Sequence, residues 1–178
     1  MPSASFEAKL AAARVWEQLI AEWTRSHGYS ILPTYDFSGK GDDKAPKLLA
    51  PSGEQSLVMP DLQCFKAGRG AWIECKYKSS ASRYNRGGYD TTGIPLRLYS
   101  HYIEVERVTQ MPVTVAFIHE SEDEVRAARL ADLSETGALY SHKDLSGKMS
   151  RGGMIFWRYA ALPILIPRLS ALTSREAA

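Results

Sequence analysis

Three residues in the middle of the chain have the types and spacing of a hydrolytic metal site. Asp61 lies in one strand-like segment, and Glu74 and Lys76 stand two residues apart in the next. Side chains two apart in a strand share a face, so Glu74 and Lys76 are expected to point the same way and Cys75 the other way. Asp61 on a neighbouring strand brings a second carboxylate alongside them. Two carboxylates with an ammonium beside them suit metal-assisted hydrolysis of a phosphodiester.

The first expected helix offers a further acid. Residues 6–27 carry apolar side chains at helical spacing, and Gly28 is placed to end the helix. Glu17 falls on the shoulder of the apolar stripe, whereas Glu7 falls toward solvent. A carboxylate on a buried shoulder needs a partner. For Glu17, a metal ion and a salt bridge to Arg14 or a lysine both remain open.

The other elements predict one α/β domain over residues 1–178. The expected strands are 29–33, 56–66, 71–77, 112–119 and 154–159. Pro95 begins an expected helix that runs to Gln110, and Ser121 with Glu124 fits a capping box for a short helix near 122–131. A short apolar helix is expected after the last strand, and the segments expected to be irregular are 34–55, 79–94 and 132–153. The predicted order is α-β-β-β-α-β.

Composition is that of an ordinary globular domain. The 178 residues are 44% hydrophobic and 24% charged, and the formal net charge is only +2. Overall charge therefore does not identify a nucleic-acid partner, and any basic surface must be local. With only two cysteines, Cys64 and Cys75, a reduced cytoplasmic setting is expected. No signal peptide is seen, and the apolar run around Pro163 is too short to span a membrane.

Together these features resemble the PD-(D/E)XK nuclease superfamily, which includes restriction endonucleases and archaeal Holliday-junction resolvases. The parts that carry the resemblance are Glu17 in a helix, then Pro60-Asp61, then Glu74-Cys75-Lys76, then a helix and the strand PVTVAFIHE. The resemblance implies a restriction endonuclease-like α/β fold, with an α-β-β-β-α-β core and a mixed central sheet flanked by helices.

The resemblance also implies roles for these residues. The acids Asp61, Glu74 and Glu17 would hold one or two Mg²⁺ ions, together with the backbone carbonyl of Cys75, and Mn²⁺ is expected to substitute. Lys76 would orient the attacking water and stabilise the developing charge. The implied activity is hydrolysis of DNA, with an endonuclease favoured and an exonuclease open. Glu7 competes with Glu17 for the helix position.

Basic and aromatic residues follow the Glu74–Lys76 segment. The candidates for DNA contact are Lys78, Arg83, Tyr84, Arg86 and Arg97. Basic side chains neutralise phosphates, and aromatic rings stack on unpaired bases. Residues 79–93 are therefore expected to form a mobile loop that closes on DNA. A weaker basic signal at Lys40, Lys44 and Lys47 is offset by neighbouring aspartates.

Two other classes of protein fit the same residues. One is a DNA-binding module that keeps the fold without catalysis. The other is a small-molecule hydrolase or structural protein in which Glu74 and Lys76 form an ordinary ion pair. A nuclease that cuts both strands of a duplex is most simply a symmetric dimer, so a homodimer is expected.

Overall fold

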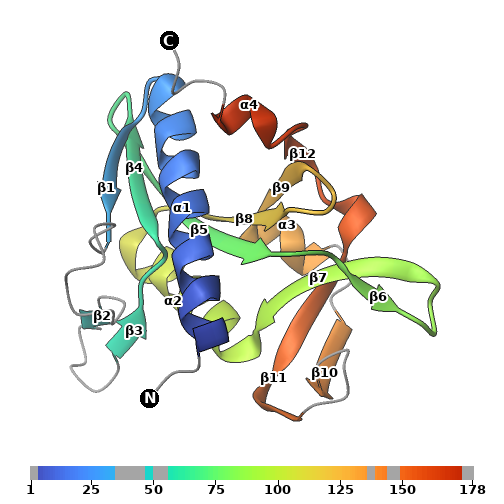
Figure 1. Ribbon diagram of the computed structural model, residues 1–178. Helices are drawn as coiled ribbons and strands as arrows, with labels where there is room; N and C mark the ends of the chain where they lie inside the picture. Colours follow the sequence, from blue (N-terminus) through green and yellow to red (C-terminus); the bar gives the residue numbers. More distant parts are fainter. Residues whose placement is uncertain (1–3, 35–46, 50–55, 136–138, 144–148, 174–178) are drawn as a thin grey trace.

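A computed structural model describes residues 4–34, 47–49, 56–135, 139–143 and 149–173. Its central sheet has six strands in the order β1-β4-β5-β8-β9-β12 (Figure 1). These strands are β1 (Ser30–Pro33), β4 (Leu62–Lys66), β5 (Arg69–Lys78), β8 (Val113–His119), β9 (Glu124–Arg129) and β12 (Ile164–Ile166). β5 and β8 run parallel and the other neighbours antiparallel, so the predicted mixed sheet is confirmed.

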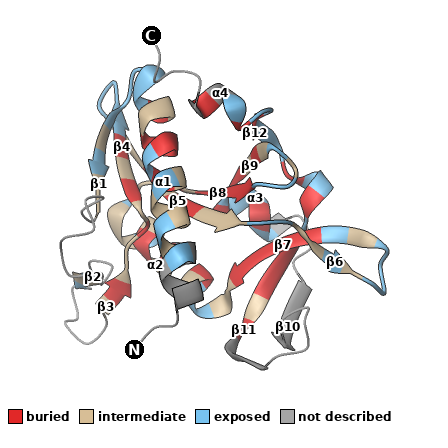
Figure 2. Ribbon diagram, in the orientation of Figure 1, coloured by how far each residue is buried: buried red, intermediate tan, exposed pale blue. Residues whose placement is uncertain are grey.

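A long helix covers each face of this sheet. On one face, α1 (Ala4–Ser26) buries Leu19 and Ile20 in a core that includes Cys75. On the other, α2 (Leu96–Thr109) buries its inward side chains in a second core, against residues that include Trp72 (Figure 2). Gly28 ends α1 in a left-handed conformation at φ 83°, which glycine adopts without a steric penalty. The expected first helix, the helix after Pro95 and the strand at 112–119 are all present.

A second sheet has the order β10-β11-β7-β6. Its strands are β6 (Ser82–Tyr84), β7 (Tyr89–Pro95), β10 (Leu139–Lys143) and β11 (Met149–Arg158). The β6–β7 hairpin follows β5 directly and projects from the body of the molecule (Figure 1). β7 then leads straight into α2, so the hairpin is anchored at both ends by elements that flank the central sheet.

The remaining described elements are short. They are β2 (Lys47–Leu49) paired with β3 (Ser56–Val58), α3 (Leu130–Glu135), a 3₁₀ helix (Tyr159–Ala161) and α4 (Ser170–Thr173). Both cysteines are buried free thiols. None of the helices in the described ranges is long and apolar enough to cross a membrane.

The prediction of a loop over residues 79–94 is wrong. Ser82–Tyr84 pairs antiparallel with Tyr89–Thr91, and the turn is closed by hydrogen bonds from the N–H groups of Gly87 and Gly88 to the carbonyl of Tyr84. Aromatic and β-branched residues on either side of a Gly-rich turn are typical of a hairpin. The structure therefore replaces a mobile loop with an ordered two-stranded element.

The predicted helix near 122–131 is also wrong. Glu124–Arg129 forms β9, which returns from β8 through a tight turn in which Asp123 has φ 50°. The open edge of β8 offers a full ladder of hydrogen bonds, and this tertiary pairing overrides the local capping signal.

Smaller corrections concern element boundaries. The expected strand 56–66 is two strands, β3 and β4, separated by residues 59–61, so Asp61 lies in the break between them. The stretch 132–153, expected to be irregular, contributes to α3, β10 and β11, so the last expected strand begins earlier, at Met149. The expected apolar helix after it is a 3₁₀ turn followed by β12 and the short α4. Most of the expected loop 34–55 lies outside the described residues.

Candidate active site

The candidate site lies at an edge of β5 that β4 leaves uncovered. β4 begins at Leu62, which pairs with Ile73, so β5 continues past the start of its neighbour. Asp61 stands one step beyond this last pair and is therefore opposite Glu74. The backbone N–H of Cys75 donates to Oδ2 of Asp61 at 2.7 Å. A strand residue directs its N–H and C=O to the same side, so the Cys75 carbonyl faces this edge too.

Asp61 is held in place by the end of β1. The hydroxyl of Thr34 donates to the carbonyls of Pro60 and Asp61 at 2.8 and 2.9 Å, and the Thr34 N–H donates to the Asp61 carbonyl at 3.0 Å. The backbone on which the carboxylate sits is thus fixed on one side by β1 and on the other by β5.

Glu74 and Lys76 share the face of β5 that looks toward α2. The Lys76 ammonium forms an ion pair with Oε1 of Glu74. The Glu74 side chain is only 1% exposed, and its Oε2 has no hydrogen-bond partner among the described residues. A buried carboxylate oxygen without a donor is costly, which makes it a natural ligand for a cation.

Glu17 reaches the same cluster from α1. Its side chain is buried, and burial together with the Glu74 carboxylate raises the pKa of Glu17 to about 7, against the opposing charges of Lys76 and Arg14. The competing residue Glu7 has a side chain outside the described part of the structure. The helix shoulder predicted for Glu17 therefore places it beside the strand acids.

The cluster brings three acids together beside Lys76 and Arg14. Burial, followed by the charge of Glu74, raises the pKa of Asp61 well above its ordinary value. Although burial opposes it, the carboxylates of Glu74 and Asp61 hold the pKa of Lys76 above its usual range. Burial thus disfavours the charged forms of Asp61 and Glu17 in spite of the nearby cations, and a bound divalent cation would favour their carboxylate forms.

The types of ligand atom at this edge suit Mg²⁺, although the side chains do not form a complete coordination shell. Among the described residues, no three His, Cys, Asp or Glu side chains stand in a ready metal-binding arrangement. Mg²⁺ needs fewer, because it is usually bound through one or two carboxylates and keeps several waters. Asp61, the free Oε2 of Glu74 and the Cys75 carbonyl supply hard oxygen ligands at one edge, and Glu17 stands close by.

Tyr102 stands beside this cluster although it is not among the predicted catalytic or metal-binding residues. It lies on the inward face of α2 and is 2% exposed, and its hydroxyl stands close enough to the Glu74 carboxylate to donate to it. Burial and the negative charge of Glu74 raise the pKa of the Tyr102 hydroxyl. A buried tyrosine requires a partner for its hydroxyl, but the sequence does not show which acid α2 will face.

Replacing Tyr102 by phenylalanine is expected to lower turnover about tenfold while leaving the core packed. The change keeps the ring and removes one hydrogen bond to a charged group, which is worth about 1.5–3 kcal/mol. Single-turnover cleavage and thermal unfolding measure the two effects. Tyr29→Phe, a change on an exposed ring outside the cluster, is the matched control. Wild-type turnover in Tyr102→Phe would show that this hydroxyl does not position Glu74.

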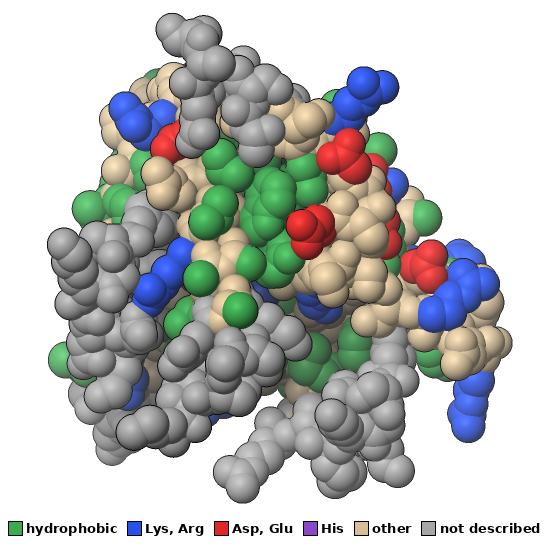
Figure 3. All heavy atoms as spheres, in the orientation of Figure 1, with side chains coloured by type: hydrophobic (Ala, Val, Ile, Leu, Met, Phe, Trp, Pro, Cys, Tyr) green, Lys and Arg blue, Asp and Glu red, His purple; other side chains and the backbone are tan. Residues whose placement is uncertain are grey.

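The residues predicted to contact DNA are spread over three places. Lys78 lies on the same face of β5 as Lys76, and burial followed by the Lys76 charge lowers its pKa to about 8. Arg83 and Arg86 are exposed on the projecting hairpin, over which basic side chains gather in Figure 3. Tyr84 packs against Tyr89 within that hairpin, their ring centroids 5.4 Å apart.

The other basic candidates stand elsewhere. Arg97 is exposed on the first turn of α2. Lys40 and Lys44 lie outside the described residues. The ring of His101 accepts the backbone N–H of Val58 through Nδ1 at 3.2 Å and so links β3 to α2.

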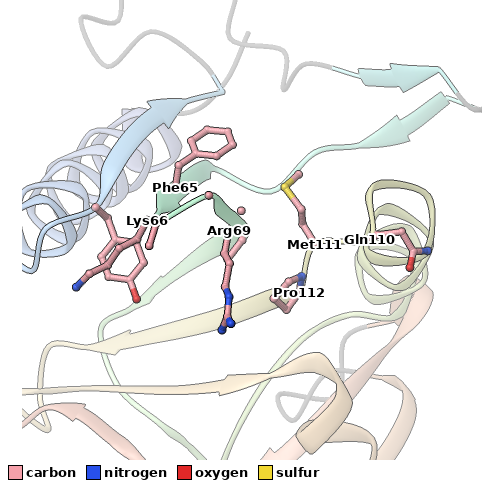
Figure 4. A pocket seen from close by; sticks show the side chains of 11 residues that line it. Phe65, Lys66, Arg69, Gln110, Met111 and Pro112 are labelled. Carbon is pink, nitrogen blue, oxygen red and sulfur yellow. The ribbon is translucent and has the colours of Figure 1, made fainter.

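A cavity of about 970 Å³ lies away from the acid cluster. It lies at the β4–β5 turn, at the other end of β5. Figure 4 shows the side chains of Phe65 and Met111 pointing one way from this rim and Arg69 the other. The Lys66 ammonium at this cavity donates a hydrogen bond to the carbonyl of His27, at 2.7 Å. No carboxylate lines the cavity, so the hydrolytic site is not assigned to it.

Two solved structures resemble this chain in overall fold. No family model and no curated sequence matches it. Archaeoglobus fulgidus Hjc, a Holliday junction resolvase from an archaeal hyperthermophile, aligns with a TM-score of 0.50 at 10% identity, over 90% of this chain and 98% of that one. D212, a nuclease from a fusselovirus, aligns with a TM-score of 0.47 at 11% identity, over 99% and 96%. The likeness to Hjc confirms the restriction endonuclease-like α/β fold that the sequence motif implied.

Proposed function

We propose that this chain is a Mg²⁺-dependent deoxyribonuclease that hydrolyses DNA phosphodiester bonds, with internal cutting favoured over removal of ends. The observation that carries the proposal is the meeting of Asp61, Glu74 and Lys76 at the uncovered edge of β5. An acid–acid–lysine set at a strand edge that β4 leaves unpaired, on a fold shared with a resolvase, supports phosphodiester hydrolysis.

Each residue has a separate task in this proposal. Asp61, Glu74 and the Cys75 carbonyl would hold Mg²⁺, with Glu17 as a further ligand, and Mn²⁺ would substitute. When bound, the ion supplies charge for the scissile phosphate and lowers the pKa of a coordinated water. Lys76 orients the attacking water and stabilises the negative charge that develops on the phosphate. Tyr102 holds Glu74 in its ligand orientation.

The surroundings of the site supply the DNA contacts. Lys78 continues the basic line of β5, while Arg83, Tyr84 and Arg86 on the hairpin and Arg97 on α2 would meet the backbone on one side. Two such sites in a homodimer would cut the two strands of a duplex.

Cleavage of a covalently closed plasmid tests this function. We expect nicked and linear products with Mg²⁺ or Mn²⁺, and none with EDTA. A closed circle has no ends, so cutting it requires an endonuclease, while degradation of linear DNA alone would identify an exonuclease. Retardation of DNA without cleavage in any divalent metal would favour the non-catalytic DNA-binding module. If the protein neither binds nor cleaves DNA, the proposal is overturned.

A further inference from the structure

A second cavity, about 510 Å³, lies between the β6–β7 hairpin and the end of β11. Its lining residues are Arg83, Tyr89, Asp90, Arg158, Tyr159, Ala160 and Ala161. Two arginines and two tyrosines thus dominate a space large enough for a small ligand. Apart from Asp90, no acid lines it.

Arg158 packs its guanidinium against an aromatic ring and has no carboxylate partner among the described residues. Its guanidinium lies over Tyr89, 4.3 Å from the ring centroid. Among the described residues Arg158 forms no ion pair, and its side chain is exposed on the last residue of β11. Arginine stacks on aromatic faces while its five N–H donors stay available in the plane. The Tyr89–Arg158 pair is therefore a flat, cationic platform open to a ligand.

Arg83 stands at the same cavity with a weak partner. It contacts Asp90 at 3.3 Å in an ion pair whose two side chains are more than half exposed. Such pairs contribute little to stability. A phosphate can therefore replace Asp90 as the partner of the Arg83 guanidinium with little loss of folding stability.

The far wall of the cavity is rigid and leads back to β5. Tyr159 stacks on the buried His119 with centroids 4.4 Å apart and planes 2° apart, and His119 bonds Thr92 at 3.0 Å. His119 is in register with Lys78 on β5. Lys78 is two residues beyond Lys76, about 6.6 Å along the strand, and His119 is about 4.8 Å across. A DNA strand held at Lys76 is thus close enough to enter the cavity.

We propose that the Tyr89–Arg158 cavity binds an unpaired nucleotide of the substrate, and that this selects DNA with a single-stranded branch or fork over continuous duplex. The base stacks on the Arg158–Tyr89 platform, and its phosphate meets Arg83. Aromatic and guanidinium planes accept any base in this way. A base inside a duplex cannot reach the platform without unpairing. The proposal rests on the nuclease function above and specifies its substrate.

The test compares binding of forked and fully paired DNA of equal length. Fluorescence anisotropy is measured with Ca²⁺ in place of Mg²⁺, and cleavage of the same DNAs with Mg²⁺. Wild type is expected to prefer the fork. Arg158→Ala is expected to weaken fork binding about tenfold, in line with the loss of one stacked base, and to change duplex binding no more than Arg129→Ala, the matched removal of an exposed arginine on β9.

Two milder variants separate stacking from charge and protect against a folding defect. Tyr89→Phe keeps the platform and should retain the fork preference. Arg158→Lys keeps the positive charge but removes the planar guanidinium, and it should lose most of the preference for forked DNA. Equal loss for fork and duplex, or an unchanged preference in Arg158→Ala, would overturn the cavity assignment while leaving nuclease activity established. A wild-type chain that neither binds nor cuts any of the DNAs would overturn both.

Discussion

Lys76→Ala is expected to lower the cleavage rate by about 10²–10³-fold while DNA affinity changes little. Removing one preorganised group that stabilises transition-state charge typically has an effect of this size. Lys76 is partly buried against Glu74. In the proposed mechanism it acts on the water and on the developing charge, so its loss should appear in turnover rather than in binding. Single-turnover cleavage and anisotropy with Ca²⁺ measure the two quantities.

The same change also leaves Glu74 without its ammonium. Breaking a buried ion pair from one side costs about 3–5 kcal/mol, so folding must be verified and turnover measured at saturating Mg²⁺. Lys66→Ala, an exposed lysine on β4, is the control for loss of one positive charge. Parallel loss of binding and turnover would make Lys76 a phosphate anchor, and unchanged cleavage would remove it from the mechanism.

Asp61→Asn is expected to abolish cleavage and, with metal absent, to leave the protein as stable as wild type or more so. Asparagine keeps an oxygen that can accept the Cys75 N–H, but it removes an acid whose charged form is disfavoured by burial and by the neighbouring Glu74 carboxylate. Relief of about 1 kcal/mol would raise Tm by about 2–4 °C in a domain of this size. The loss of metal-dependent charge stabilisation, several kcal/mol, corresponds to about 10³-fold or more in rate.

Thermal unfolding with and without Mg²⁺ gives a readout independent of activity. At a Mg²⁺ concentration tenfold above its Kd, wild type should gain about 1.4 kcal/mol of stability. Asp61→Asn should gain much less, while Asp132→Asn, a change on the exposed surface of α3, should behave as wild type. A variant that melts lower than wild type without metal, yet responds fully to Mg²⁺, would contradict the assignment of Asp61 as a ligand.

The parts of the fold that sequence could predict are those in which local pattern and tertiary pairing agree. The stripe of α1, the strand at Val113–His119 and the two-residue spacing of Glu74 and Lys76 each specify one conformation. The position of Asp61 opposite Glu74 follows from the β4–β5 register, which the sequence alone does not give.

The wrong predictions of secondary structure concern segments whose conformation depends on pairing with a strand distant in the sequence. Glu124–Arg129 is helical by local signals and becomes a strand because β8 offers an edge. The β6–β7 hairpin had the turn residues of a hairpin, but its partner β11 lies more than 50 residues later in the chain. Tyr102 and Arg158 enter the site and the cavity through the packing of α2 and β11, which no spacing in the sequence encodes.

The uncovered edge of β5 bears on self-association as well as on chemistry. A strand edge with free N–H and C=O groups is a template on which another chain can add a strand. The Asp61 carboxylate occupies the Cys75 N–H, and a cluster of buried charges surrounds the rest of this edge. The residues that make the edge hydrolytic therefore also protect it from β-sheet aggregation. Substitutions at position 61 that remove both the charge and the acceptor would inactivate the protein and expose it to misassembly at the same point.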